Sequence, residues 1–156
     1  MGVSFMNLRF LKSNKVRTIP FTEALPNRNP FYESKINMKK TLVLGASSKV
    51  TRVSNQAVHR LKLAGHEVVP VGIREGSIAG IDIQKGQPEV KGVDTITMYL
   101  SAKNQEQYYD YILDLAPKRI IFNPGAENAE LYQMAKENGI EVENACTLVM
   151  LSVSAY

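Results

Sequence analysis

The sequence contains one cysteine, two histidines and no tryptophan among its 156 residues. A single cysteine excludes an internal disulfide framework and a zinc site built from cysteines. The two histidines, His59 and His66, leave little for a histidine-rich metal centre. No apolar run approaches the ~18 residues that a membrane-spanning helix needs. These absences favour a protein of a reducing compartment, so we expect a cytoplasmic location and no membrane partner.

The excess of positive charge is confined to one end of the chain. Residues 1–37 hold six basic and two acidic side chains, which account for the whole net charge of +4. Residues 38–156 carry thirteen of each sign, a balance that argues against a nucleic-acid partner. The first 37 residues contain three prolines and no regular hydrophobic period. We therefore expect them to form a poorly ordered extension outside the core, with Met38 as a candidate natural start and residues 38–156 as one folded domain.

From Thr41 onward, short apolar strands alternate with amphipathic helices. Strands are predicted at 41–45, 67–72, 93–100, 119–122 and 140–144. Helices are predicted at 54–64, 104–115, 128–138 and 146–151. Residues 74–92 are rich in glycine and predict a loop with a small hairpin or short strand. This alternation is typical of an α/β fold, a doubly wound, mostly parallel sheet of five or six strands with helices on both faces.

Three residues mark the ends of these elements. Ser54 is predicted to cap the first helix, because its hydroxyl can accept from a free backbone N–H one turn further on. Gly65 is predicted to end that helix. Pro70 has no N–H to donate, which places its strand at or near an edge of the sheet, or the proline at the end of the strand.

In open parallel sheets, ligands bind beyond the carboxyl ends of the strands, near the point where the strand order reverses. The first loop selected by this rule, residues 45–53, is suited to a phosphate because it leads into a helix start. Gly45 allows close approach of a ligand, and Ser47 and Ser48 add hydroxyl donors. Arg52 can pair with a phosphate through two hydrogen bonds. The loop is neither a GxGxxG nor a Walker A motif, and an ordinary strand-to-helix turn is the alternative interpretation.

The next loops refine the choice of ligand. NAD sites usually end the second strand with an acidic residue, whereas this chain has Gly72 and then Arg74. Positive charge there suits an adenosine with an extra ribose phosphate, as in coenzyme A or NADP, although Glu75 follows. A solvated arginine is the alternative. Pro124 and Gly125 form a turn past which a ligand could run, or a plain turn before the next helix.

Residues for catalysis are few. Cys146 has no histidine near it in the sequence and precedes an apolar run, which is typical of a buried, inert thiol. Both histidines belong to the first helix region and are expected to be structural or solvated. We predict no catalytic residue and no metal site.

Taken in order, these segments resemble the small stand-alone CoA-binding proteins, which are similar to the nucleotide-binding domain of the succinyl-CoA synthetase α subunit. The resemblance covers roughly residues 39–156. The matching residues are 42–47, Arg52, Ser54, 65–71, 123–128, 137–140 and 145–147. The family commonly has Val-Asn-Pro after its second strand, from which residues 71–74 of this chain depart.

The resemblance implies a Rossmann-like fold that binds CoA through its diphosphate at the first loop. It implies that the phosphates are held by Gly45, Ala46, Ser47, Arg52 and Ser54, with Ser48 beside them. It implies that the adenosine end is flanked by Gly72 and Arg74, and that the pantetheine side is lined by Tyr99, Leu100, Asn123, Pro124 and Gly125. Cys146 matches a cysteine often found near that pocket, which implies thiol or disulfide chemistry with CoA.

The leading hypothesis is a module that binds CoA or an acyl-CoA without turnover of its own. The chain lacks the phosphohistidine and grasp domains of the synthetase, as the family does. One alternative is an NAD(P)-dependent oxidoreductase with Tyr99 or Lys103 as the proton donor. Another is a non-catalytic partner subunit of a larger acyl-CoA enzyme, and a homo-oligomer is a further open alternative.

Overall fold

The computed structural model describes residues 38–156, so the expectations for residues 1–37 lie outside the described residues. Five parallel strands form the central sheet in the order β2-β1-β5-β6-β7. They are β1 (Lys40–Leu44), β2 (Glu67–Val71), β5 (Thr95–Met98), β6 (Arg119–Phe122) and β7 (Glu141–Asn144). The order reverses between β1 and β5, because β2 lies on one side of β1 and all later strands lie on the other. The predicted doubly wound α/β fold is confirmed.

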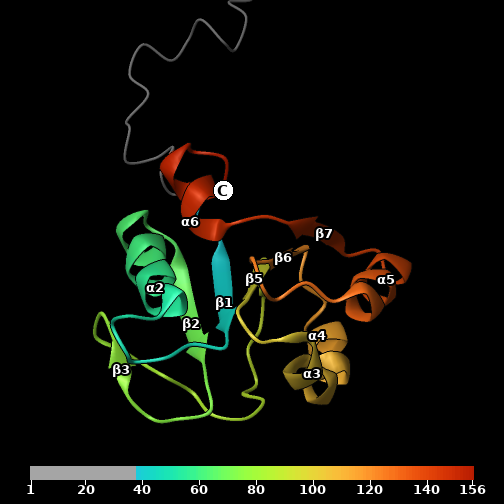
Figure 1. Cartoon of the computed structure of the whole chain (residues 1–156), viewed down its shortest axis with the longest axis horizontal. Helices are drawn as coiled ribbons and strands as arrows, with labels where there is room; N and C mark the ends of the chain where they lie inside the picture. Colours follow the sequence, from blue (N-terminus) through green and yellow to red (C-terminus); the bar gives the residue numbers. More distant parts are fainter. Residues whose placement is uncertain (1–37) are drawn as a thin grey trace, which may run out of the picture.

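Helices cover both faces of this sheet (Figure 1). They are α2 (Val53–Leu63), α3 (Ala102–Gln105), the 3₁₀ turn η2 (Glu106–Tyr108), α4 (Tyr109–Leu115), α5 (Ala129–Glu137) and α6 (Thr147–Ser152). Leu42 and Leu44 of β1 face a core shared with α4 and α5. Val43, between them, faces a second core with Val58 and Leu61 of α2. This alternation follows from the period of two in a strand, which sends successive side chains to opposite faces.

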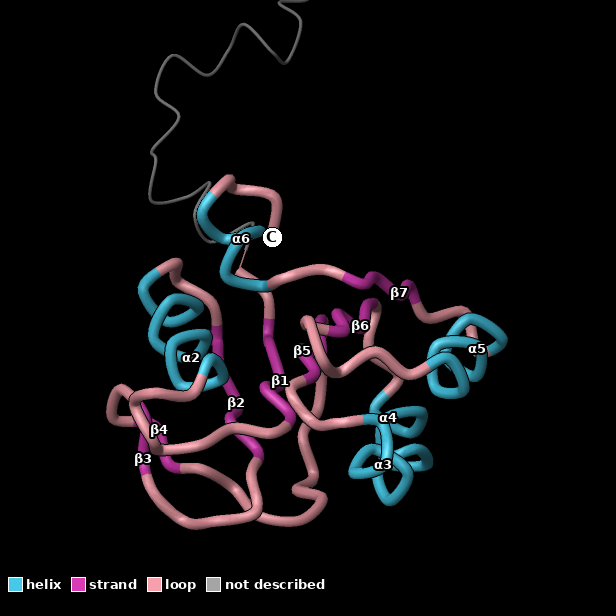
Figure 2. The backbone as a smooth tube through the Cα atoms, viewed as in Figure 1, coloured by secondary structure: helices cyan, strands magenta, loops and turns pink. Residues whose placement is uncertain are grey.

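The edge strand β2 is covered by the segment that follows it. A hairpin of β3 (Ser77–Ile78) and β4 (Ile81–Asp82) folds back beside β2 (Figure 2). Beyond it, the N–H of Gln84 donates to the carbonyl of Pro70 (2.9 Å), and the N–H of Gly72 donates to Gln84 O (2.9 Å). The predicted edge position of Pro70 and the predicted hairpin are both confirmed.

Two predictions about helix ends have different outcomes. Gly65 follows α2 with a φ of +85°, and the N–H of His66 returns to Leu61 O, so the predicted end is confirmed. The predicted Ser54 cap is wrong, because Arg52 is the N-cap residue and no side chain caps the helix. Ser54 is instead the second helical residue and is buried. The helix begins at Val53, one residue before the predicted start, and the buried Asn55 donates to Ser47 O in the preceding loop.

The face of the sheet beneath α6 is more polar than the opposite face. Thr97 Oγ1 lies 2.7 Å from Thr147 Oγ1 at the start of α6. Thr41 Oγ1 lies 2.7 Å from Tyr156 Oη beyond its end. Hydroxyl pairs therefore hold α6 across the strands at both ends of the helix. Within residues 38–156, no helix has the length and apolar character that crossing a membrane requires.

Candidate functional site

The loop after β1 presents free backbone N–H groups. The N–H groups of Gly45 and Ala46 both donate to Val71 O (2.9 Å each), which ties this loop to the end of β2. The buried side chain of Asn55 donates to Ser47 O at 3.0 Å and so turns the next peptide plane. Among the described residues, no hydrogen-bond partner exists for the N–H groups of Ser47, Ser48, Val53 and Ser54. Free N–H groups of this kind at a helix start favour an anion.

Two glycines let the loops of this edge pack on one another. Gly45 has a φ of +97°, and a Cβ on it would lie 3.0 Å from the carbonyl carbon of Tyr99. Gly72 is buried, and a Cβ on it would overlap the carbonyl oxygen of Ala46. The loops after β1, β2 and β5 are therefore in backbone contact where the strand order reverses. This close packing requires the absence of a side chain at Gly45 and Gly72.

Positive charge at this edge is not neutralised by nearby acids. Arg52 and Arg74 are both exposed and form no ion pair within residues 38–156. Glu75, the acid beside Arg74, pairs instead with Lys85 at 2.7 Å, and this hydrogen bond lowers the pKa of Glu75. Both guanidinium groups are therefore free to bind phosphate.

Hydrogen bonds of one buried side chain hold the loop after β6 in place. Asn123 is buried, and its Nδ2 donates to Thr97 Oγ1 (2.7 Å) and Met98 O (3.0 Å). Its Oδ1 accepts from the N–H of Thr147 at 2.9 Å. The side chain thus joins β5, β6 and α6. The backbone of Asn123 is also bonded, since its N–H donates to Met98 O (3.3 Å) and its C=O accepts from the N–H of Ala126 (2.8 Å). Pro124 and Gly125 are exposed, and Gly125 has a φ of +87°.

A phenol and a thiol lie on the α6 side of the same edge. The ring of Tyr99 is mostly buried, and burial raises the pKa of its hydroxyl to about 12. Tyr99 Oη has no hydrogen-bond partner among the described residues, although the hydroxyls of Thr97 and Thr147 lie nearby. Cys146 is half-buried, bears a free thiol, and is close enough for its charge to influence Tyr99. Tyr99 therefore remains a protonated donor at neutral pH, beside a thiol.

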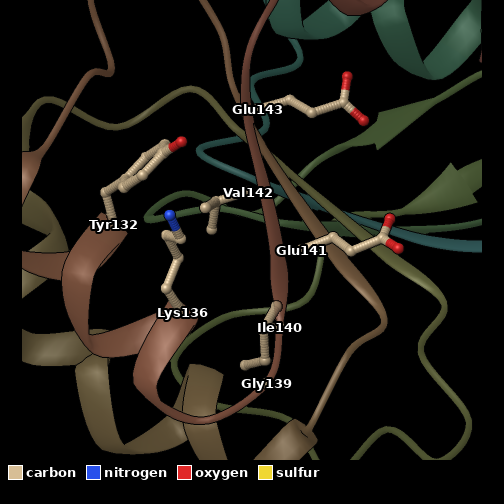
Figure 3. Close-up of a pocket in the computed structure, with 7 residues that line it drawn as sticks. All are labelled: Tyr132, Lys136, Gly139, Ile140, Glu141, Val142 and Glu143. Atoms are coloured by element: carbon tan, nitrogen blue, oxygen red, sulfur yellow. The ribbon is translucent and has the colours of Figure 1, made fainter.

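Two cavities among the described residues lie away from these loops. One, of about 470 Å³, lies between α5 and β7, and Figure 3 shows Tyr132 and Lys136 on one side of it and the strand on the other. Glu141 and Glu143 also line it, but their carboxylates point to the side of the strand away from Tyr132 and Lys136 (Figure 3). The second, of about 380 Å³, lies at the amino ends of the strands, where Lys40 and Lys118 are paired with acids. Neither cavity is lined by a predicted site residue.

The two histidines also lie outside the loops. His59 is exposed on α2. His66 accepts a hydrogen bond from the N–H of Lys39 at 3.2 Å, and its ring centroid lies 4.9 Å from that of Tyr156. Burial, with the charges of Lys39 and Arg119, lowers the pKa of His66.

Sequence reasoning missed two buried amides that organise the site, Asn55 and Gln105. Gln105 donates to Leu100 O at 2.8 Å and to Ala126 O at 2.7 Å, and so joins the loops after β5 and β6. The available signal was a polar residue one position away from an apolar helical stripe. That signal is weak, because asparagine and glutamine side chains are mostly exposed.

Solved structures share this arrangement. A crystal structure of an uncharacterized protein is 50% identical, with a TM-score of 0.75, and the match covers 76% of this chain and 98% of that one. A conserved hypothetical protein from Pyrococcus furiosus is 27% identical, with a TM-score of 0.62 and coverage of 72% and 97%. A protein from Thermus thermophilus shares the fold at 19% identity, with a TM-score of 0.69 and coverage of 83% and 99%. A search of curated proteins gave no match.

One family model describes most of the folded part. The model of the CoA binding domain matches residues 39–152, which include every loop of the carboxyl edge. The resemblance drawn from the sequence is confirmed, and the chain belongs to the CoA-binding domain family.

Proposed function

We propose that this chain binds CoA or an acyl-CoA reversibly at the carboxyl edge of its sheet, without turnover of its own. The observation that carries the proposal is the set of unpartnered N–H groups in the loop after β1 and at the start of α2. A diphosphate supplies the acceptors that these donors lack. Arg52, the N-cap residue of α2, adds a free guanidinium beside them.

The adenosine end of the ligand lies at the loop after β2. Arg74 has no acidic partner within residues 38–156, because Glu75 is occupied by Lys85. Its charge suits the 3′-phosphate of CoA. Gly72 leaves no side chain between this loop and Ala46, so that the diphosphate and the adenosine can lie over adjoining backbone.

The pantetheine arm runs along the loops after β5 and β6, past Leu100, Pro124 and Gly125. Its thiol end then lies toward Cys146. The buried hydroxyl of Tyr99 supports this direction of the arm. A buried donor without an acceptor costs about 1–3 kcal/mol of stability. A thiolate or a thioester carbonyl at the end of the arm can accept the hydrogen bond of this hydroxyl. CoA itself supplies the thiol for acyl transfer, while the protein's residues bind and orient it.

Ligand-dependent stability tests the proposal. CoA at 100 times its dissociation constant should raise the free energy of unfolding by about 2.7 kcal/mol. Dephospho-CoA should give a smaller effect, because it lacks the phosphate that Arg74 binds. Since NADP also carries an extra ribose phosphate, it is the competing ligand and belongs in the same assay with NAD. Stabilisation by NADP without stabilisation by CoA would replace this proposal with the oxidoreductase hypothesis.

A further inference from the structure

Gln105 is completely buried, yet it carries a polar side chain at the end of α3. Its Nε2 donates to Leu100 O (2.8 Å), in the loop after β5, and to Ala126 O (2.7 Å), in the loop after β6. Its Oε1 accepts from Asn128 Nδ2 at 2.9 Å. One amide therefore fixes the direction of two carbonyls in separate loops of the carboxyl edge.

Fixing these carbonyls also fixes the N–H groups that follow them. All peptide bonds in residues 38–156 are trans, and in a trans peptide the C=O and N–H point in opposite directions. Because Leu100 O and Ala126 O point inward to Gln105, the N–H groups of Ser101 and Glu127 point away from it. Both residues are exposed, and neither N–H group has a partner within the described part of the chain.

We propose that Gln105 is a positioning residue for the pantetheine arm, an inference that rests on the proposed function. The arm carries two amide carbonyls, which need donors when they leave water. Gln105 holds the two loops so that the N–H groups of Ser101 and Glu127 meet these carbonyls. The side chain acts through the loops and does not touch the ligand.

The neighbouring Asn128 sets the orientation of this amide. Its Oδ1 accepts from the N–H groups of Glu130 (3.1 Å) and Leu131 (3.2 Å), so it caps α5 with one atom. Its Nδ2 holds Gln105 Oε1 with the other. An Asn128→Asp variant keeps the cap but removes the donor, which favours rotation of the Gln105 amide away from both carbonyls.

The test compares CoA with 3′,5′-ADP, which lacks the pantetheine arm and the phosphate that carries it, by calorimetric titration of the full chain. Gln105→Met and Asn128→Asp are each expected to lower the affinity for CoA about tenfold and to leave the affinity for 3′,5′-ADP unchanged. Gln133→Met is the matched control, because Gln133 is an exposed glutamine on α5 whose side chain bonds, within residues 38–156, only to Glu137. It should bind both ligands as the wild type does.

Each alternative outcome contradicts a distinct claim. Unchanged CoA affinity in a folded Gln105→Met variant, or in Asn128→Asp if the first variant does not fold, would overturn the positioning role alone. An equal loss for both ligands would also overturn it, since damage to the fold would then explain the result. If the wild type bound 3′,5′-ADP but gained nothing from the arm, the inference would fail while the phosphate site stood. Wild-type protein that bound neither ligand would refute the proposed function itself.

Discussion

Replacing Gly72 with alanine probes the contact between the loops after β1 and β2. The added Cβ would overlap the carbonyl oxygen of Ala46 and lie 3.0 Å from Ile83 Cγ2. The first neighbour is backbone and cannot rotate aside, so the loop after β1 must move. Overpacking of this kind costs about 1–3 kcal/mol. The same displacement should shift the free N–H groups of the phosphate site, and we expect CoA to bind about tenfold more weakly.

Urea denaturation and calorimetric titration measure the two effects separately. Gly86→Ala is the control, because Gly86 has a φ of +68° but no atom within 4 Å of an added Cβ. Its cost of about 1 kcal/mol comes from backbone strain alone, and its CoA affinity should equal that of the wild type. A Gly72→Ala protein with wild-type stability and wild-type CoA affinity would refute the packing argument.

Three further predictions follow from the site and its surroundings. Arg52→Ala should weaken the binding of CoA by about 1.5–3 kcal/mol and leave the binding of adenosine unchanged in titrations. A variant that bound CoA as tightly as the wild type would show that Arg52 is not part of the site. Cys146→Ser should abolish any mixed disulfide with CoA in mass spectra while sparing reversible binding, and persistence of the adduct would reject the thiol role. The pKa of His66 is lowered in the folded state, so the unfolded chain binds the proton more readily, and stability should fall as the pH drops below about 6.5. His66→Asn, which keeps an acceptor for the N–H of Lys39, should flatten that dependence in urea titrations across pH, and an unchanged slope would assign it to another group.

Much of the fold could be predicted because local signals and tertiary packing agree. Pro70 lacks a donor and lies on the edge strand, and Gly65 adopts the positive φ that ends α2. Asn128, the first residue of the helix predicted at 128–138, is the N-cap residue of α5 and accepts from two N–H groups of that helix. In each case one residue type has one backbone requirement, so the prediction does not depend on distant contacts.

The predicted helix at 104–115 shows where such reasoning fails. The structure divides this region into α3, η2 and α4, with Gln105 drawn inward to carbonyls of two other loops. Hydrophobic periodicity identifies the apolar positions, and Tyr111 and Ile112 are indeed buried. It carries no information on a polar side chain whose partners lie in other loops. The Ser54 cap failed because the helix begins at Val53, so that Ser54 lies inside it as a buried residue.

The candidate site, like the fold, could be predicted from the sequence only in part. The family that the sequence resembled is confirmed by the model that matches residues 39–152. The choice of the carboxyl edge as the ligand side of the sheet stays a prediction. The individual contacts of Arg74, Tyr99 and Cys146 with a ligand stay predictions. The internal bonds of Asn123 could not be read from sequence, because they depend on Thr97 and Thr147, which are brought together only by the folded sheet.

The central claim is that the diphosphate of CoA lies at the loop after β1 and the start of α2. Amide chemical shifts of isotope-labelled protein, recorded during titration with CoA, test it most directly. The account predicts the largest changes at Ser47, Ser48, Val53 and Ser54. It predicts smaller changes at the same residues with 3′,5′-ADP, which carries one 5′-phosphate in place of the diphosphate. Changes confined to the cavity between α5 and β7, or to the amino ends of the strands, would contradict it.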